Sequence, residues 1–243
     1  VATNIGVNAP QALKEAASDA SKERFIQSMS GIDPKDLNRI NDAAGDASKK
    51  YTGMNKAQFM ELARDTFNNM SNQANFEKVF GSVAAMGQFQ MMFNKDSESA
   101  KRETQRLIKA ADLAGKLDNP KNMENFVKGT TAARIVSGRD VTSADWLNFM
   151  RYSKQGRYAA SDRFMYGIMP SMADEMGGAR AGTALSAFID NIAGRGSKTS
   201  RRYQQSIGMA DENGRAYGYE KGMVNPQEFV WGPLTDVLKK KNI

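Results

Sequence analysis

Basic residues gather in one short stretch of this chain, where they are suited to bind an anion or a nucleic acid. Four cationic residues within eight positions form the stretch: Arg195, Lys198, Arg201 and Arg202. Tyr203 follows them directly. Cationic side chains beside an aromatic ring can follow a phosphate backbone and stack on a base. A solvated loop that leads into a helix, capped by Thr199 or Ser200, would have the same composition, so both interpretations stay open here.

Two residue types that carry much of enzyme chemistry are absent, because the chain contains no His and no Cys. The chain therefore lacks the usual general base, the Ser-His-Asp arrangement, thiolate nucleophiles and the commonest ligands of transition metals. Paired carboxylates remain, as in glycosidases, but the Asp and Glu residues are scattered along expected helical faces. No phosphate-binding loop of the Gly-x-x-x-x-Gly-Lys-Ser/Thr type occurs. We therefore expect no enzymatic activity, no metal site and no cofactor.

Small residues recur with a spacing of four after two adjacent glycines, Gly177 and Gly178. Glycine readily adopts the left-handed conformation that closes many helices, so the pair predicts the end of one helix and the start of the next. In that second helix Gly178, Gly182 and Ser186 lie on one face. A face with so little side chain lets another helix backbone approach closely. We expect a tight helix crossing there.

The motifs around this face occur in a recognisable order. From Val141 the chain runs through Val-Thr-Ser-Ala-Asp-Trp-Leu-Asn-Phe to a Met-rich segment at 165–176, and then to Gly-Gly-Ala-Arg-Ala-Gly-Thr-Ala-Leu. Ser-Arg-Arg-Tyr at 200–203 and Ile-Gly-Met at 207–209 follow. This order resembles a helical region of the tail tape-measure (minor tail) proteins of tailed bacteriophages and related prophage particles. The resemblance covers roughly residues 80–240.

The resemblance implies a structural virion protein. Tape-measure proteins lie extended inside the tail tube, set tail length during assembly and leave ahead of the DNA in genome ejection. The implied partners are the tail tube protein, tail-tip or baseplate proteins and a tail assembly chaperone. The implied location is the virion, in the lumen of the tail tube or at the tail tip, with the host cytoplasm during assembly. We also expect self-association, through residues 164–189 and their small-residue face.

The length of the chain limits how it could act as a ruler. A compact chain of 243 residues is about 35–45 Å across, which is too short for a ruler of useful span. We therefore expect a globular module of a longer ruler, or a plug near the tail tip. A first residue of Val rather than Met agrees with a piece of a longer or processed protein.

Two other functions stay open. The first is a helical nucleic-acid-binding protein that uses the basic C-terminal half. Residues 1–100 hold 11 Lys and Arg against 12 Asp and Glu, whereas residues 101–243 hold 23 against 15. An excess of positive charge in the C-terminal half attracts nucleic acid, and it equally keeps a protein soluble. The second is a cell-wall hydrolase with two catalytic carboxylates. No apolar run is long enough to span a membrane, and no secretory signal opens the chain.

The spacing of apolar residues and the positions of helix-start and helix-stop residues predict an all-α protein. We expect a compact multi-helix assembly with at most a short β-ribbon near 209–220, around Asn213-Gly214. Helix starts are predicted at these signals: Ala9-Pro10, Asp33-Pro34, Asn55, Asp96, Asn119-Pro120, Ser143, Asp162 and Pro226. Residues 76–93 are apolar on more than one face, which predicts a central buried helix. We expect Pro170 to break or kink the helix over 162–176 and a further helix to run over 226–241.

The same residue patterns suggest that the chain has two parts. We expect an N-terminal helical segment over residues 1–75 and a tape-measure-like helical domain over residues 76–243, or one continuous domain that joins them.

Overall fold

A computed structural model describes residues 32–137 and 140–240 of the chain. Over these two ranges the chain forms helices and no β-strand, with one isolated antiparallel bridge between Ala210 and Ala216. The predicted all-α, multi-helix fold with at most a short ribbon near 209–220 is therefore confirmed. No helix within the described ranges is long and apolar enough to cross a membrane. The predicted helix start at Ala9-Pro10 lies outside the described residues.

The chain divides into two compact units, which are described here one at a time. Unit 1 comprises residues 1–108 and 117–124, and unit 2 comprises residues 109–116 and 125–243. The division falls within α5 (Ser97–Leu113) and α6 (Pro120–Val136). The predicted boundary between residues 75 and 76 stays a prediction.

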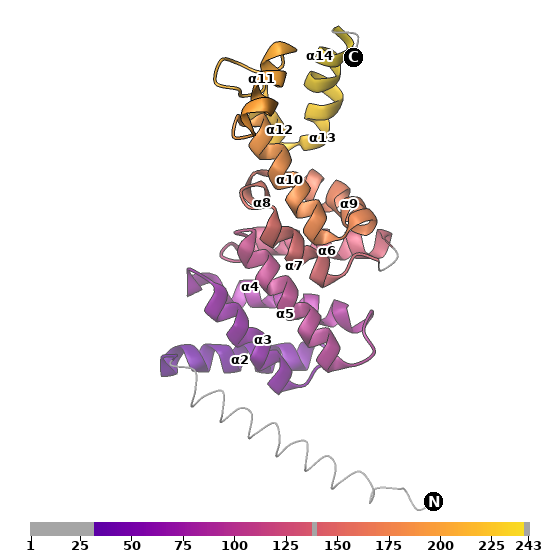
Figure 1. Cartoon of the computed structure of the whole chain (residues 1–243). Coiled ribbons are helices and arrows are strands. Elements are labelled where there is room, and N and C mark those ends of the chain that lie inside the picture. The colour runs from indigo at the N-terminus through magenta and orange to yellow at the C-terminus, as the bar shows by residue number, and fades with distance from the viewer. Residues whose placement is uncertain (1–31, 138–139, 241–243) are drawn as a thin grey trace, which may run out of the picture. The chain divides into compact units, whose positions relative to one another are not determined.

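Unit 1 is a packed group of helices in which α2, α3 and α4 contact one another (Figure 1). The bounds are Pro34–Lys50 for α2, Lys56–Asn69 for α3, Gln73–Asn75 for the 3-10 turn η1 and Phe76–Met91 for α4. Asp33 caps α2 by accepting a hydrogen bond from the Lys35 N–H at 2.8 Å. Asn55 and Gln58 form a reciprocal capping box at the start of α3. Both helix starts were predicted correctly, because caps act within one turn.

The segment over 76–93 does form a buried helix, α4, although it is shorter than predicted. The buried apolar residues of α4 are Phe76, Val79, Phe80, Val83, Ala84 and Met86. The helix ends at Met91, and Met92 is 69% exposed. Of the two predicted residues beyond this end, Met92 is exposed and Phe93 is half-buried against Phe89.

Arg39 links α2 to the beginning of α4. Its Nε and Nη2 atoms donate to the two carboxylate oxygens of Glu77 at 2.7 and 3.1 Å, and Nη2 also donates to the Gln73 carbonyl at 2.8 Å. This hydrogen bonding holds the pKa of Glu77 below its ordinary value, so the carboxylate stays ionised at neutral pH. A two-pronged guanidinium–carboxylate pair is among the stronger charged contacts in proteins.

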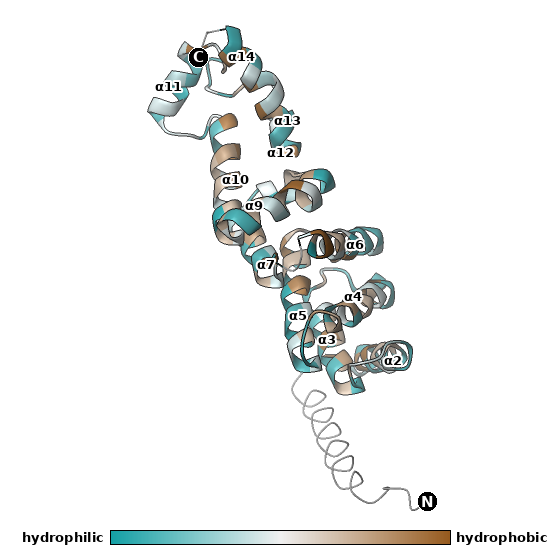
Figure 2. Ribbon diagram, turned by 90° about the vertical axis from the view of Figure 1, so that its right-hand side faces the viewer, coloured by the Kyte–Doolittle hydropathy of each residue, from teal (hydrophilic) through white to brown (hydrophobic). Residues whose placement is uncertain are grey.

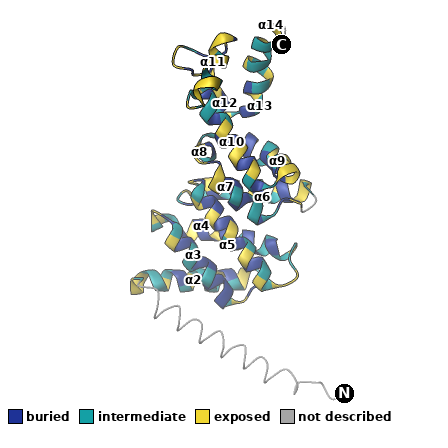
Figure 3. Cartoon of the chain, viewed as in Figure 1, coloured by how far each residue is buried: buried dark blue, intermediate teal, exposed yellow. Residues whose placement is uncertain are grey.

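Unit 2 is built from shorter helices (Figures 1 and 2). Their bounds are Ser143–Tyr152 for α7, Gly156–Ala159 for α8, Phe164–Ile168 for η2, Met169–Met176 for α9, Gly178–Ile192 for α10, Lys198–Ser206 for α11, Tyr219–Val224 for α12, Pro226–Phe229 for α13, Val230–Leu234 for η3 and Thr235–Lys240 for α14. The Phe126 and Trp146 rings pack edge to face with centroids 6.2 Å apart. A second buried cluster supports the C-terminal helices: Ile192, Ile207, Met209, Ala216 and Phe229. Figure 3 shows the buried residues of unit 2 in dark blue, and none of them belongs to α11, η3 or α14.

Two prolines produce π-helical turns in unit 2. Pro170 lies in the first turn of α9, and the preceding η2 segment closes with a Met169 N–H to Phe164 carbonyl bond. Pro233 lies inside η3, where the Thr235 N–H bonds the Val230 carbonyl. A proline has no N–H for the carbonyl four residues earlier, so a wider turn can replace the α-helical one. Residues 162–176 thus stay helical past Pro170, and the predicted break or kink takes the form of a π-helical turn just before the proline.

The predicted helix over 226–241 forms throughout its described residues, 226–240, which are helical without a gap. Its hydrogen bonding is not α-helical along the whole length, because the π-helical turn η3 around Pro233 lies between α13 and α14. Residue 241 lies outside the described part.

Candidate functional site

The small-residue face predicted from the sequence lies against α7. A Cβ atom added at Gly178 would lie 2.1 Å from the Asp145 carbonyl oxygen, and one added at Gly182 would lie 2.6 Å from the Phe149 carbonyl oxygen. Real Cβ atoms do not approach other heavy atoms so closely. The α10 helix therefore crosses α7 with backbone against backbone, and only glycine fits at these two positions.

The Asp145 carboxylate serves the first turns of both crossing helices. Its Oδ2 atom accepts from the Thr142 N–H at 3.0 Å and from the Thr142 hydroxyl at 2.7 Å. Its Oδ1 atom accepts from the Gly178 N–H at 3.1 Å, which is the first N–H of α10. Negative charge is favourable at a helix N-terminus, so one side chain stabilises two such ends. Sequence reasoning missed Asp145, although the Thr-x-x-Asp spacing is close to a capping box.

The cap of α7 differs from the prediction by one residue. Thr142, and not Ser143, is the N-cap, since its hydroxyl accepts from the Asp145 N–H at 3.3 Å. Ser143 is buried as the first residue of the helix. Gly177 has a φ of +79°, which lets it end α9 and precede α10 without the strain that a side chain would suffer.

Ser186 lies one turn beyond Gly182 and is also buried, at 7% exposure. It lines a cavity of about 270 Å³ together with residues that follow α7, among them Ser153 and Gly156. The predicted small-residue face is thus internal to unit 2 over the two glycines. It is not available to a second copy, and self-association through residues 164–189 must use another part of that region.

The four cations of the basic stretch do not form one site. Arg195 donates to Asp190 at 2.9 Å and to the Gln155 side-chain carbonyl at 3.1 Å, so its charge is used within the fold. The aliphatic part of Arg201 lies against Gly214, where an added Cβ would come within 2.9 Å of the Arg201 Cδ. Arg195 therefore bonds groups on two segments, and Arg201 packs its stem against the turn at Gly214.

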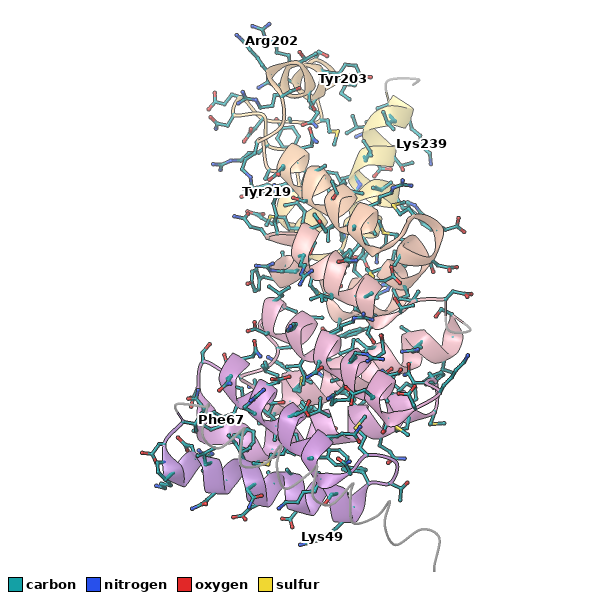
Figure 4. The ribbon with its side chains drawn as sticks, turned by 60° about the horizontal axis from the view of Figure 1, so that its bottom comes forward. Lys49, Phe67, Arg202, Tyr203, Tyr219 and Lys239 are labelled. Carbon is teal, nitrogen blue, oxygen red and sulfur yellow. The ribbon has the colours of Figure 1, made fainter. Side chains whose placement is uncertain are left out.

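Lys198, Arg202 and Tyr203 face solvent, as does Arg195, whose guanidinium group is paired with Asp190. Lys198 and Arg202 are exposed and have no ion pair within the described residues, and Tyr203 is 55% exposed. Figure 4 shows Arg202 and Tyr203 projecting from α11. The N-cap of this helix is Ser197, whose hydroxyl accepts from the Ser200 N–H at 3.1 Å, so the predicted caps Thr199 and Ser200 are wrong. The surface of α11 thus presents two unpaired cations and an exposed aromatic ring that are available to bind an anion.

The acidic residues near Lys101 in unit 1 are engaged in ion pairs. Lys101 contacts both Glu61 and Glu98. Burial lowers the pKa of Lys101, but its hydrogen bonds to the two carboxylates outweigh this effect and raise the pKa overall. The same contact lowers the pKa of Glu98. Across residues 32–137 and 140–240 no three His, Cys, Asp or Glu side chains are grouped so that they could hold a metal ion.

A cavity of about 510 Å³ in unit 2 is lined by α6, η2 and α9. Tyr166 reaches into the packing between these elements, where its ring leaves no room for a side chain at Gly129. Burial, and secondarily the charge of Asp162, raises the pKa of the Tyr166 hydroxyl. The phenol therefore stays protonated at neutral pH.

Comparison of the chain with protein-family models, with curated proteins and with solved structures gives no match. The arguments about function therefore rest on the geometry of the α7–α10 crossing, on the solvent-facing part of α11 and on the resemblance described above.

We expect Gly182→Ala to destabilise the fold by about 1–3 kcal/mol, because the new methyl group meets the α7 backbone and one helix must move. Gly182→Leu should cost more. The matched control is Gly81→Ala, since a Cβ in that α4 position has nothing within 4 Å. Removing a helix-interior glycine there should be neutral or stabilising by up to about 1 kcal/mol. Denaturant unfolding of the three variants checks this, and equal effects at 81 and 182 would contradict the close crossing.

We expect Asp145→Ala to destabilise the chain by about 1–3 kcal/mol, since two helix starts lose their side-chain acceptor. Asp145→Asn should lie between wild type and Ala, because an amide has a single acceptor oxygen for the Thr142 and Gly178 N–H groups. Thermal denaturation measures the order. Asp174→Ala, at an exposed position of α9, is the control and should change little. If Asn were as stable as Asp, the carboxylate would not serve both helices.

Proposed function

We propose that this chain is a helical structural module of a tail tape-measure protein of a tailed phage or a related prophage particle. The observation that carries the proposal is the α7–α10 crossing. The residues on which the resemblance depends, Gly178, Gly182 and the Thr-Ala-Leu that follows, belong to the helix that makes this crossing. A motif used for helix packing supports a role in architecture and protein contact rather than in chemistry.

The disposition of the charged groups agrees with a non-enzymatic role. Asp145 is used in helix capping, and Glu61, Glu77 and Glu98 are paired with cations. The proposed partners are the tail tube protein, the tail-tip or baseplate proteins and an assembly chaperone. The proposed location is the tail lumen or tip, where the module takes part in setting tail length and in genome ejection.

The test uses particles from the strain that carries the reading frame. Peptides of this chain should be found in purified tails by mass spectrometry, and deletion of the reading frame should abolish tails or leave tails of irregular length in electron micrographs. Genomic Gly182→Leu should reduce the yield of tailed particles, because the module no longer packs, whereas Gly81→Ala should not. Tails of normal length after the deletion, with no peptide of this chain in wild-type particles, would refute the proposal.

A second function is favoured by a separate observation, the solvent-facing Lys198, Arg202 and Tyr203 of α11. Few hydrophobic residues occur on this helix (Figure 2). The two cations can contact phosphates, and the exposed ring can stack on a base of a single strand. This nucleic-acid-binding role does not require the chain to be part of a phage tail.

If this second function is correct, Lys198→Ala with Arg202→Ala should lower the slope of log affinity against log salt by about 1–2 for a DNA oligonucleotide, since each phosphate contact contributes roughly 0.7–0.9. Lys49→Ala with Lys50→Ala is the matched control, with the same loss of charge on α2. Tyr203→Ala should weaken binding of single strands more than of duplexes. Fluorescence anisotropy over a salt series measures all of these. Absence of binding at low salt, or equal effects of the two double variants, would exclude the role.

A further inference from the structure

An open apolar groove lies on unit 2, formed by elements from three separate parts of its sequence. Its volume is about 320 Å³. η2 and α9 supply Phe164, Ile168 and Met172, α10 supplies Ala184, Leu185 and Phe188, and α13 with η3 supplies Pro226, Gln227, Val230 and Trp231. The Phe188 ring packs edge to face on Phe229 with centroids 5.8 Å apart, so the groove is supported by the C-terminal core.

Trp231 lines this groove with its side chain largely in water. It is 82% exposed, whereas Trp146, the other tryptophan of the chain, is 2% exposed. An exposed indole beside an open apolar groove presents a projecting group and a hollow on the same surface. Exposed apolar surface of this kind marks an interaction site, and tryptophan is enriched among the residues that dominate binding energy.

The lining of the groove is apolar apart from Gln227. The side-chain oxygen and nitrogen of Gln227 are covered by the protein and form no hydrogen bond within the described residues. The surface that the groove offers is therefore apolar, and an aromatic side chain is a chemically suitable occupant.

Two exposed side chains of opposite charge lie on the helices that line the groove. Arg180 precedes Ala184 by one turn of α10, and Glu175 follows Met172 by nearly one turn of α9. Both are exposed, and neither forms an ion pair in the described part of the chain. A surface that carries one unpaired cation and one unpaired anion matches its own copy across a two-fold axis that passes between the two charges, because each charge then meets its opposite.

We propose that this surface binds a second copy of the chain, in a two-fold dimer in which Trp231 of each copy enters the groove of the other. Arg180 of one copy lies opposite Glu175 of its partner. The projecting indole and the groove share one surface, and the two charges lie on helices that line it, as a symmetric contact requires. The proposal does not rest on the proposed tail function, because it is tested on the purified chain alone.

The first experiment measures sedimentation velocity and tryptophan emission of the full chain over a wide concentration range. We expect a monomer–dimer equilibrium, with emission moving to shorter wavelength as the dimer forms and Trp231 leaves water. Trp231→Ala should weaken the dimer about 30-fold or more and abolish the shift, since Trp146 is already buried. Tyr217→Ala is the control, because Tyr217 is 61% exposed and does not line the groove.

The second experiment tests the symmetry through the charges. Arg180→Glu and Glu175→Arg should each weaken the dimer, and the chain that carries both changes should recover its affinity because each copy again offers opposite charges. A chain that is monomeric at all concentrations overturns the proposal, as does a dimer that Trp231→Ala leaves unchanged or a double variant without recovery. The proposal is also overturned if the wild-type chain stays monomeric and its tryptophan emission shifts only when the apolar dye anilinonaphthalene sulfonate is added. That result would assign the groove to a small ligand.

Discussion

A single carboxylate, that of Asp145, joins the first turns of two helices whose backbones touch. The N–H groups at a helix start have no partner inside the helix, so each start needs an acceptor from elsewhere. Asp145 supplies one to Thr142 and another to Gly178. The approach is so close that a Cβ at position 178 would collide with the Asp145 backbone itself. Capping and glycine packing thus depend on each other.

The position of α10 has consequences along its whole length. The helix runs from the crossing to Ile192, which belongs to the core cluster of the C-terminal helices. The side of α10 that faces away from α7 carries Ala184 and Phe188, which line the apolar groove. The two π-helical turns associated with Pro170 and Pro233 supply other parts of that groove. One face of α10 therefore makes the internal contact with α7, and the opposite face forms part of the exposed apolar groove.

The proposed structural role and the proposed dimer use different properties of unit 2. At the glycine crossing the backbones of α7 and α10 are in contact, so the two helices cannot move apart without losing that contact. Such a helix pair suits an architectural module. The groove with Trp231 gives an exposed surface that can bind a partner. The basic stretch offers fewer cations than its sequence suggests, because Arg195 pairs with Asp190 and the stem of Arg201 packs against Gly214, which leaves Lys198 and Arg202 for an external anion.

Local chemistry by itself determined the helical class and several helix starts, such as those after Asp33 and Asn55, because capping acts within one turn. The spacing of Gly178 and Gly182 also determined that one helix face has no side chains. The tertiary structure alone decided that α7 covers this face, that Asp190 and Gln155 engage Arg195, and that Trp231 lies beside a groove. These outcomes depend on residues that are distant in sequence, and the period of a single helix carries no information about which distant helix will pack against it.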